Sequence, residues 1–77
     1  SYRLYGEKGA IMKRISVDNG MHWVSPETAL ETIDIDTMAV YMDDDTREAV
    51  HHDIAPCTDA EFVAEYLHRA PDDLIIG

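Results

Sequence analysis

The stretch MDDDTREAVHHDIAPCTDAEF, residues 42–62, gathers the residue types that most often bind metals or act as acids, bases and nucleophiles. It contains three consecutive aspartates, two adjacent histidines and the only cysteine of the chain, Cys57. Imidazoles, thiolates and carboxylates are the usual ligands of zinc and calcium. A thiol activated by a histidine is a common catalytic nucleophile. The spacing of these side chains decides between such a site and the start of an acidic helix.

The spacing does not favour a metal site. His51 and His52 are adjacent, so on a helix they point about 100° apart and do not face one ion. The patterns His-x-x-x-His and His-Glu-x-x-His are absent. The run 43–45 lacks the glycine and the terminal glutamate of a calcium loop. We therefore expect no metal and no other cofactor, with both histidines on a solvated helix face.

A catalytic thiol is also not favoured. Cys57 lies just before a predicted helix start, where the helix dipole lowers a thiol pKa, but the surrounding carboxylates disfavour the thiolate. Packing as a small apolar group is the simpler role for this side chain. No Gly-rich phosphate loop, nucleophile elbow or Cys-x-x-Cys pair occurs. The sequence thus predicts a protein that is not an enzyme, and a small metal or thiol enzyme stays the third hypothesis.

The first third of the chain is typical of β-structure. In IMKRISV, 11–17, the set Ile11, Lys13, Ile15 and Val17 alternates with Met12, Arg14 and Ser16, which we interpret as the two-residue period of a strand. Asp-Asn-Gly at 18–20 favours a tight hairpin turn, and MHWV at 21–24 is the predicted return strand. YRLYG at 2–6 is a possible further strand. The apolar run in DLIIG, 73–77, is too short for a helix and suits a strand added to this sheet.

Helix starts account for many of the acids. Ser25 before Pro26 predicts a first helix, and Asp36 is the expected cap of a second short one. Asp45 with Glu48 has the spacing of a capping box for a third helix. The buried face of that helix is expected to hold Ala49, Val50 and Ile54. Thr58 with Glu61 repeats the box before a fourth helix whose apolar face is Phe62, Val63, Tyr66 and Leu67. Residue 71 is proline and stops it.

The fold class expected from these elements is α+β. It consists of a small antiparallel sheet, made of the N-terminal hairpin plus the C-terminal strand, packed with three to four short helices. Because chains of 77 residues rarely divide into two cores, residues 1–77 are expected to form a single acidic domain.

Charge is the most unusual property of the sequence. Sixteen acids against six Lys/Arg give a net charge of −10. Residues 1–20 hold four Lys/Arg against two acids, whereas residues 21–77 hold fourteen acids against Arg47 and Arg69 alone. Such a field repels nucleic acid and anionic membranes and attracts basic protein surfaces. No apolar run approaches the roughly 20 residues that cross a bilayer. A single cysteine fits a reducing compartment, so a cytoplasmic location is expected.

The run MDDDTREAVHHDIAPCTDAEFVAEYLHRAPDDLIIG and the upstream ISVDNG carry a resemblance. Over about residues 14–77 the chain resembles small, uncharacterised acidic proteins of the mobile elements of Gram-positive bacteria. Mobile-element proteins of this size and acidity include anti-restriction and anti-CRISPR proteins, several of which occupy nucleic-acid-binding surfaces of host nucleases. The resemblance implies that class and assigns neither a target nor a catalytic residue.

Two binding hypotheses lead. In the first, the chain is an inhibitor that mimics DNA and occupies a basic, nucleic-acid-binding surface of another protein. In the second, it is a regulatory or scaffolding adaptor that binds through an apolar surface, and a homodimer is one form that it could take. Of the neighbours His22 and Trp23, one is expected in the core, and burial of Trp23 is the simpler expectation; if exposed, it would anchor an interface. The candidate partner-binding residues are Asp43, Asp44, Asp45, Asp53, Asp59, Asp72, Asp73 and Trp23.

Overall fold

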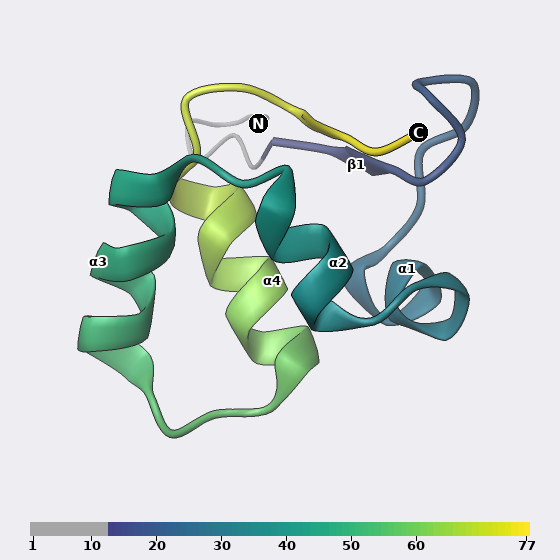
Figure 1. The fold of residues 1–77 in the computed structure, drawn as a ribbon. Coiled ribbons are helices and arrows are strands. Elements are labelled where there is room, and N and C mark those ends of the chain that lie inside the picture. The colour runs from purple at the N-terminus through teal and green to yellow at the C-terminus, as the bar shows by residue number, and fades with distance from the viewer. Residues whose placement is uncertain (1–12) are drawn as a thin grey trace, which may run out of the picture.

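The two short strands come from opposite ends of residues 13–77, which are the residues that the computed structural model describes. β1 (Ile15–Ser16) and β2 (Leu74–Ile75) run parallel, with Ile15 opposite Leu74 and Ser16 opposite Ile75. Four helices separate them in sequence: α1 (Pro26–Thr32), α2 (Ile35–Val40), α3 (Asp44–Ile54) and α4 (Asp59–Arg69). Figure 1 shows α2, α3 and α4 together on one side of the strand pair. The α+β class is confirmed, and the antiparallel sheet is wrong.

The expected hairpin is wrong because β1 ends at Ser16 and does not continue to the Asn-Gly turn. Asn19 and Gly20 both have positive φ, as the Asn-Gly pair predicts. The turn, however, is organised by side chains: the Ser16 hydroxyl donates to the Asp18 carboxylate at 2.7 Å, and that carboxylate accepts the His22 backbone N–H at 2.8 Å. The return segment therefore touches β1 only at a bridge between Ile15 and Val24.

β2 pairs along the edge of β1 opposite to this bridge. The backbone N–H of Leu74 donates to the carbonyl of Arg14, and that of Ile76 donates to the carbonyl of Ser16. A parallel pair requires a long crossover between its strands, and here all four helices form it. The predicted C-terminal strand is confirmed, while the predicted strand at residues 2–6 lies outside the described residues.

Helix caps follow the sequence at two of the four starts. Ser25 caps α1, and Thr58 with Glu61 forms the expected capping box of α4, with bonds of 3.1 and 2.9 Å. The other two caps were placed two residues too late: Asp34 caps α2 and Asp43 caps α3. The backbone N–H of Asp43 donates to the Tyr66 hydroxyl at 2.8 Å. This bond fixes Asp43 in an extended conformation outside the helix, so the cap falls there and not at Asp45.

The core lies around α4. Its Val63, Tyr66 and Leu67 are buried and pack in one cluster with Val50 of α3 and Met38 of α2. Other members come from α1 and the two strands: Ile15, Ala29, Met42, Ala70, Leu74 and Ile76. Phe62 and Ile54 are half-buried beside it, but Ala49, which was expected to face inward, is exposed. The C-terminal apolar run thus supplies core as well as strand.

The caps give a first testable prediction. Thr58→Ala should lower the free energy of unfolding by about 0.5–2 kcal/mol, because it removes the acceptor of the Glu61 N–H. Asp43→Ala should likewise lower the melting temperature, whereas Asp45→Ala should leave it nearly unchanged. Thermal and urea denaturation of the three variants measure this. Equal losses for Asp43→Ala and Asp45→Ala would contradict the cap assignment.

Candidate protein-binding surface

Several of the carboxylates have structural partners. Asp43 accepts from the backbone N–H and the hydroxyl of Thr46, at 3.0 and 2.8 Å. Asp53 on α3 accepts from Arg69 on α4 at 2.6 Å, and Arg69 also binds Glu65 at 2.7 Å. These bonds anchor helix starts and join α3 to α4. Asp43 and Asp53 therefore add negative charge to the surface, but their main role is to stabilise the fold.

Other carboxylates on α3 are free to meet a partner. Asp45 and Glu48 are exposed and have no hydrogen bond or ion pair with any residue from 13 to 77. Asp44 is 78% exposed and has a surface ion pair with Arg47 at 3.1 Å. Consecutive residues and their i+3 and i+4 neighbours lie close together on a helix. The first two turns of α3 thus carry the densest run of accessible negative charge among the described helices.

The remaining predicted acids lie apart from this run. Asp59 is the first residue of α4, and Asp72 is exposed in the segment between α4 and β2. Asp73 accepts the backbone N–H of Arg14 at 2.8 Å and its guanidinium at 3.3 Å. Acids of α1, Glu27 and Glu31, are exposed as well. Negative charge is therefore spread over the four helices and the segment before β2, with one concentration on α3.

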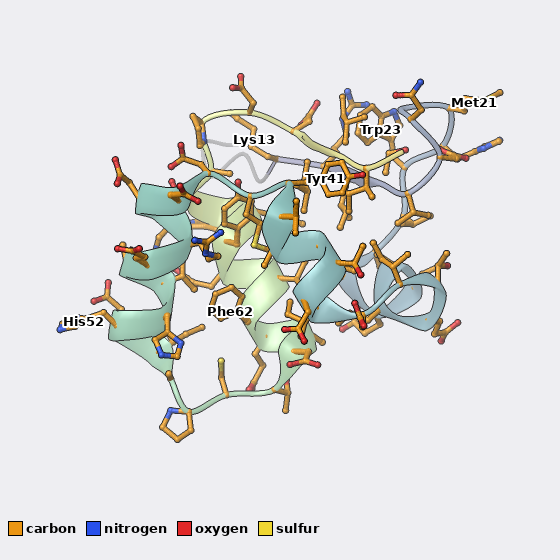
Figure 2. The ribbon with its side chains drawn as sticks, viewed as in Figure 1. Lys13, Met21, Trp23, Tyr41, His52 and Phe62 are labelled. Carbon is orange, nitrogen blue, oxygen red and sulfur yellow. The ribbon has the colours of Figure 1, made fainter. Side chains whose placement is uncertain are left out.

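Trp23 is not in the core. It is 36% exposed, and the Arg14 guanidinium carbon lies 4.0 Å from its ring centroid, as in a cation–π contact. His22 is exposed too, with Nδ1 2.6 Å from the Asp18 carboxylate. The expectation that one of these neighbours is buried is wrong, because the strand that would have placed it inside does not form. Through Arg14, Trp23 is brought close to Asp73, and Figure 2 shows Trp23 and Met21 at the same end of the molecule.

Sequence reasoning missed a groove where α2, α3 and α4 meet. The groove has a volume of about 410 Å³. Ile35, Asp36 and Ala39 line it from α2, and the linings from the other helices include Arg47, His51, Asp59 and Phe62. Figure 2 shows Phe62 on α4 in the space between α2 and α3. The signal available in the sequence was the i, i+3 spacing of Asp36 with Ala39 and of Asp59 with Phe62, which puts each acid beside an apolar side chain.

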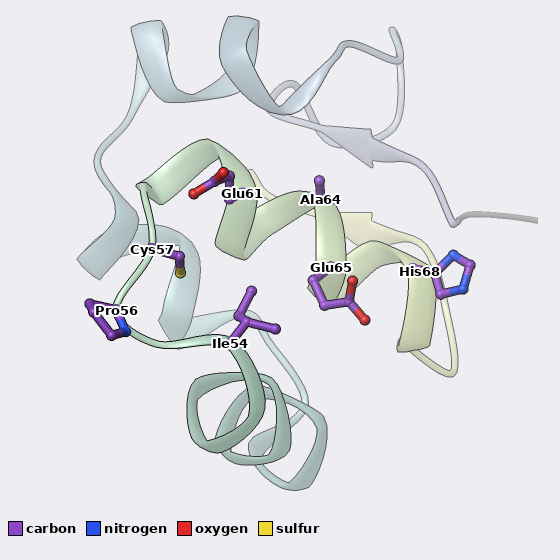
Figure 3. Close-up of a pocket in the computed structure, with 7 residues that line it drawn as sticks. All are labelled: Ile54, Pro56, Cys57, Glu61, Ala64, Glu65 and His68. Atoms are coloured by element: carbon purple, nitrogen blue, oxygen red, sulfur yellow. The ribbon is translucent and has the colours of Figure 1, made fainter.

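A second hollow, of about 640 Å³, lies on the other side of the segment that joins α3 to α4. Figure 3 shows that Ile54, Cys57 and the α4 side chains Glu61, Glu65 and His68 line it. Both of its carboxylates already have partners, since Glu61 belongs to the capping box and Glu65 binds Arg69. It offers a partner less unpaired charge than the groove between the three helices.

Of the histidines and the cysteine in residues 42–62, His51 and Cys57 line the groove, and His52 does not. Cys57 is half-buried and lines both hollows. His51 lines the groove, with its ring 6.5 Å from that of Phe62, and His52 points away from the helix bundle in Figure 2. Within residues 13–77, no three His, Cys, Asp or Glu side chains lie together as a metal site requires. In the same part of the chain, none of the helices is both long enough and apolar enough to cross a membrane.

Hydrogen bonds lower the pKa of five carboxyls below their ordinary value of 3.8. The causes are bonds from the Ser16 hydroxyl to Asp18, from Thr37 to Asp34, from Thr46 to Asp43, from Arg69 to Asp53 and from the Arg14 backbone to Asp73. A carboxyl with a lowered folded-state pKa stabilises the fold fully above its unfolded-state pKa, and this stabilisation is lost as the pH falls through the folded-state value.

We therefore expect the free energy of unfolding to decline once the pH falls below about 4. Urea denaturation at intervals from about pH 6 to about pH 2 measures this. Asp43→Asn should show a smaller decline than the unchanged chain, because one of the responsible carboxyls is absent. Stability that keeps rising to the lowest pH would show that relief of repulsion among the acids outweighs these bonds.

The comparisons with known proteins give one match. The family model of the anti-CRISPR protein AcrIC5 matches residues 31–69, just over half of the chain. The matched segment contains α2, α3 and α4 complete, including the acidic turns of α3 and every helical residue of the groove named above. Neither a curated protein nor a solved structure matches the chain. The anti-CRISPR class implied by the sequence resemblance is confirmed: the chain belongs to the AcrIC5 family of anti-CRISPR proteins.

Proposed function

We propose that this protein inhibits a CRISPR–Cas system by covering a basic, nucleic-acid-binding surface of one of its components. It acts by occupancy and not by catalysis, and its carboxylates take the place of phosphates. The observation that carries the proposal is the run of accessible carboxylates over the first two turns of α3, inside the segment that the family model matches. Membership of an anti-CRISPR family supplies the class of partner.

The amount of charge supports a mimic. The longest dimension of the molecule is 38 Å, and the net charge is −10. One strand of DNA carries about 11 phosphates over that length, at one charge per 3.4 Å. The net charge of the protein is therefore similar in size to that of one DNA strand of the same length. A groove that holds nucleic acid would attract it by the same long-range field.

An adaptor that binds through apolar contacts is the alternative, and specific side chains favour it. Val40 is 80% exposed and Met21 is 77% exposed, and Tyr41 and Trp23 are also accessible. Exposed aromatic side chains are frequent anchors of protein interfaces. The two functions differ in how the affinity for the partner depends on salt. Salt screens contacts between charges and so weakens the mimic, whereas it leaves apolar contacts largely unchanged.

The test is the affinity for the isolated CRISPR–Cas effector over a salt series, with and without DNA as a competitor. The mimic predicts that affinity falls steeply as salt rises and that DNA and the protein exclude one another. Trp23→Ala should change affinity little. A flat salt response, no competition by DNA and a large loss from Trp23→Ala or Tyr41→Ala would replace the mimic by the adaptor.

A further inference from the structure

The groove between α2, α3 and α4 combines an apolar floor with unpaired acids at its rim. Phe62 and Ile35 are half-buried, so each presents part of its apolar surface to the groove. Asp36 and Asp59 are exposed, line the groove from different helices, and have no ion pair with any residue from 13 to 77. A volume of about 410 Å³ lies within the range of clefts that bind small ligands.

The cationic side chains of the groove do not cancel these acids. Arg47 is only 31% exposed, and its guanidinium donates to the Ala39 carbonyl at 2.9 Å and pairs with Asp44 at 3.1 Å. Its charge is therefore already matched by a third carboxylate, and its position against α2 is fixed. His51 lies against Phe62 with an interplanar angle of 57°. The groove is therefore lined by two carboxylates without an ion partner among residues 13–77 and by the aromatic ring of Phe62.

We propose that this groove receives an arginine side chain of the partner, with its guanidinium at Asp36 and Asp59 and its stem along Phe62 and Ile35. Arginine fits this chemistry because its planar guanidinium both pairs with carboxylates and stacks on aromatic rings, while its stem is apolar. Arginines are the residues with which a nucleic-acid-binding surface contacts phosphates. The groove therefore adds a specific contact to the long-range attraction of α3. This inference rests on the function proposed above.

The first arm of the test uses a peptide and needs no partner protein. A short peptide with two arginines between glycines is titrated into ¹⁵N-labelled protein, beside analogues in which citrulline or lysine replaces arginine. We expect amide shifts to concentrate at residues 35–39 and 59–62 with the arginine peptide and to be weaker with lysine. Citrulline, which has the same shape but no charge, should give almost none. Shifts spread evenly over all acidic helices, or equal for arginine and lysine, would overturn the assignment.

The matched control lies on α1. Asp36 and Asp59 occupy the first turns of α2 and α4, and Glu27 occupies the first turn of α1, outside the groove. Asp36→Asn with Asp59→Asn should weaken peptide binding about tenfold, whereas Glu27→Gln with Glu31→Gln removes the same charge and should change it less than about twofold. Phe62→Leu keeps an apolar side chain and should weaken arginine binding by removing the ring. Melting temperatures confirm that each variant is folded.

The second arm repeats these variants against the CRISPR–Cas effector. If the unchanged protein binds no effector, the proposed function fails, and the peptide arm still decides what the groove binds. If the unchanged protein binds the effector and the Asp36/Asp59 variant binds it as tightly as the Glu27/Glu31 variant, the groove assignment alone fails. A selective loss for the Asp36/Asp59 and Phe62→Leu variants supports both.

Discussion

Replacing Asp44, Asp45 and Glu48 together by their amides should slow association with the CRISPR–Cas partner by about tenfold or more. Each exposed carboxylate contributes little alone because water and salt screen it, so single changes should have small effects. Together the three side chains hold most of the accessible charge on the first two turns of α3. The dissociation rate should change less than the association rate, and the difference from the unchanged protein should shrink as salt rises.

A second triple variant makes this experiment specific. Glu27→Gln, Glu31→Gln and Asp72→Asn remove the same net charge from α1 and from the segment before β2. If α3 faces the partner, this variant should bind faster than the α3 variant at every salt concentration. Identical rates for the two triples would mean that only net charge matters and that α3 has no special place in the interface. Asp43 and Asp53 are kept in both, because their loss would damage a helix cap and the Arg69 network.

The features that the sequence predicted correctly are those set by neighbours along the chain. Ser25 before Pro26 and Thr58 with Glu61 each start a helix where expected, because a cap depends on three or four consecutive residues. The run 43–45 is accessible as expected for the same reason. The cap of α3 was misplaced because Tyr66, 23 residues further on, binds the backbone of Asp43. Because residues 43–45 are all aspartates, the local sequence does not show which of them is the cap.

The sheet and the groove depend on packing that no short pattern contains. Asn19 and Gly20 adopt the expected turn conformation, yet the partner of β1 is a segment almost 60 residues later. Which segment pairs with β1 depends on where the four intervening helices bring the chain back to it. Likewise, Asp36 and Asp59 are visible as acids in the sequence, but the groove that both of them line depends on the arrangement of three helices. Both features require the tertiary structure, and one of them carries the inferred arginine contact.

Leu67→Ala should abolish binding at the temperatures at which it unfolds, without changing a single charge. Leu67 is 2% exposed in the core, and its backbone carbonyl accepts the N–H of Lys13 at 3.0 Å. Truncating a buried leucine costs about 2–5 kcal/mol, while a chain of this length has a total stability of about 4–12 kcal/mol. The variant should therefore melt far below the unchanged protein. Val40→Ala, at a side chain that is 80% exposed, should leave stability nearly unchanged.

The same variant tests whether the acids act as an arrangement or only as a quantity of charge. Leu67→Ala keeps all sixteen acids, so the unfolded chain is still a polyanion. If affinity for the effector falls in proportion to the folded fraction, the carboxylates bind only where α3 and the three-helix groove position them. Affinity that persists at temperatures where the variant is unfolded and the effector is intact would show binding by charge alone. That outcome would mean that binding requires neither the α3 surface nor the groove.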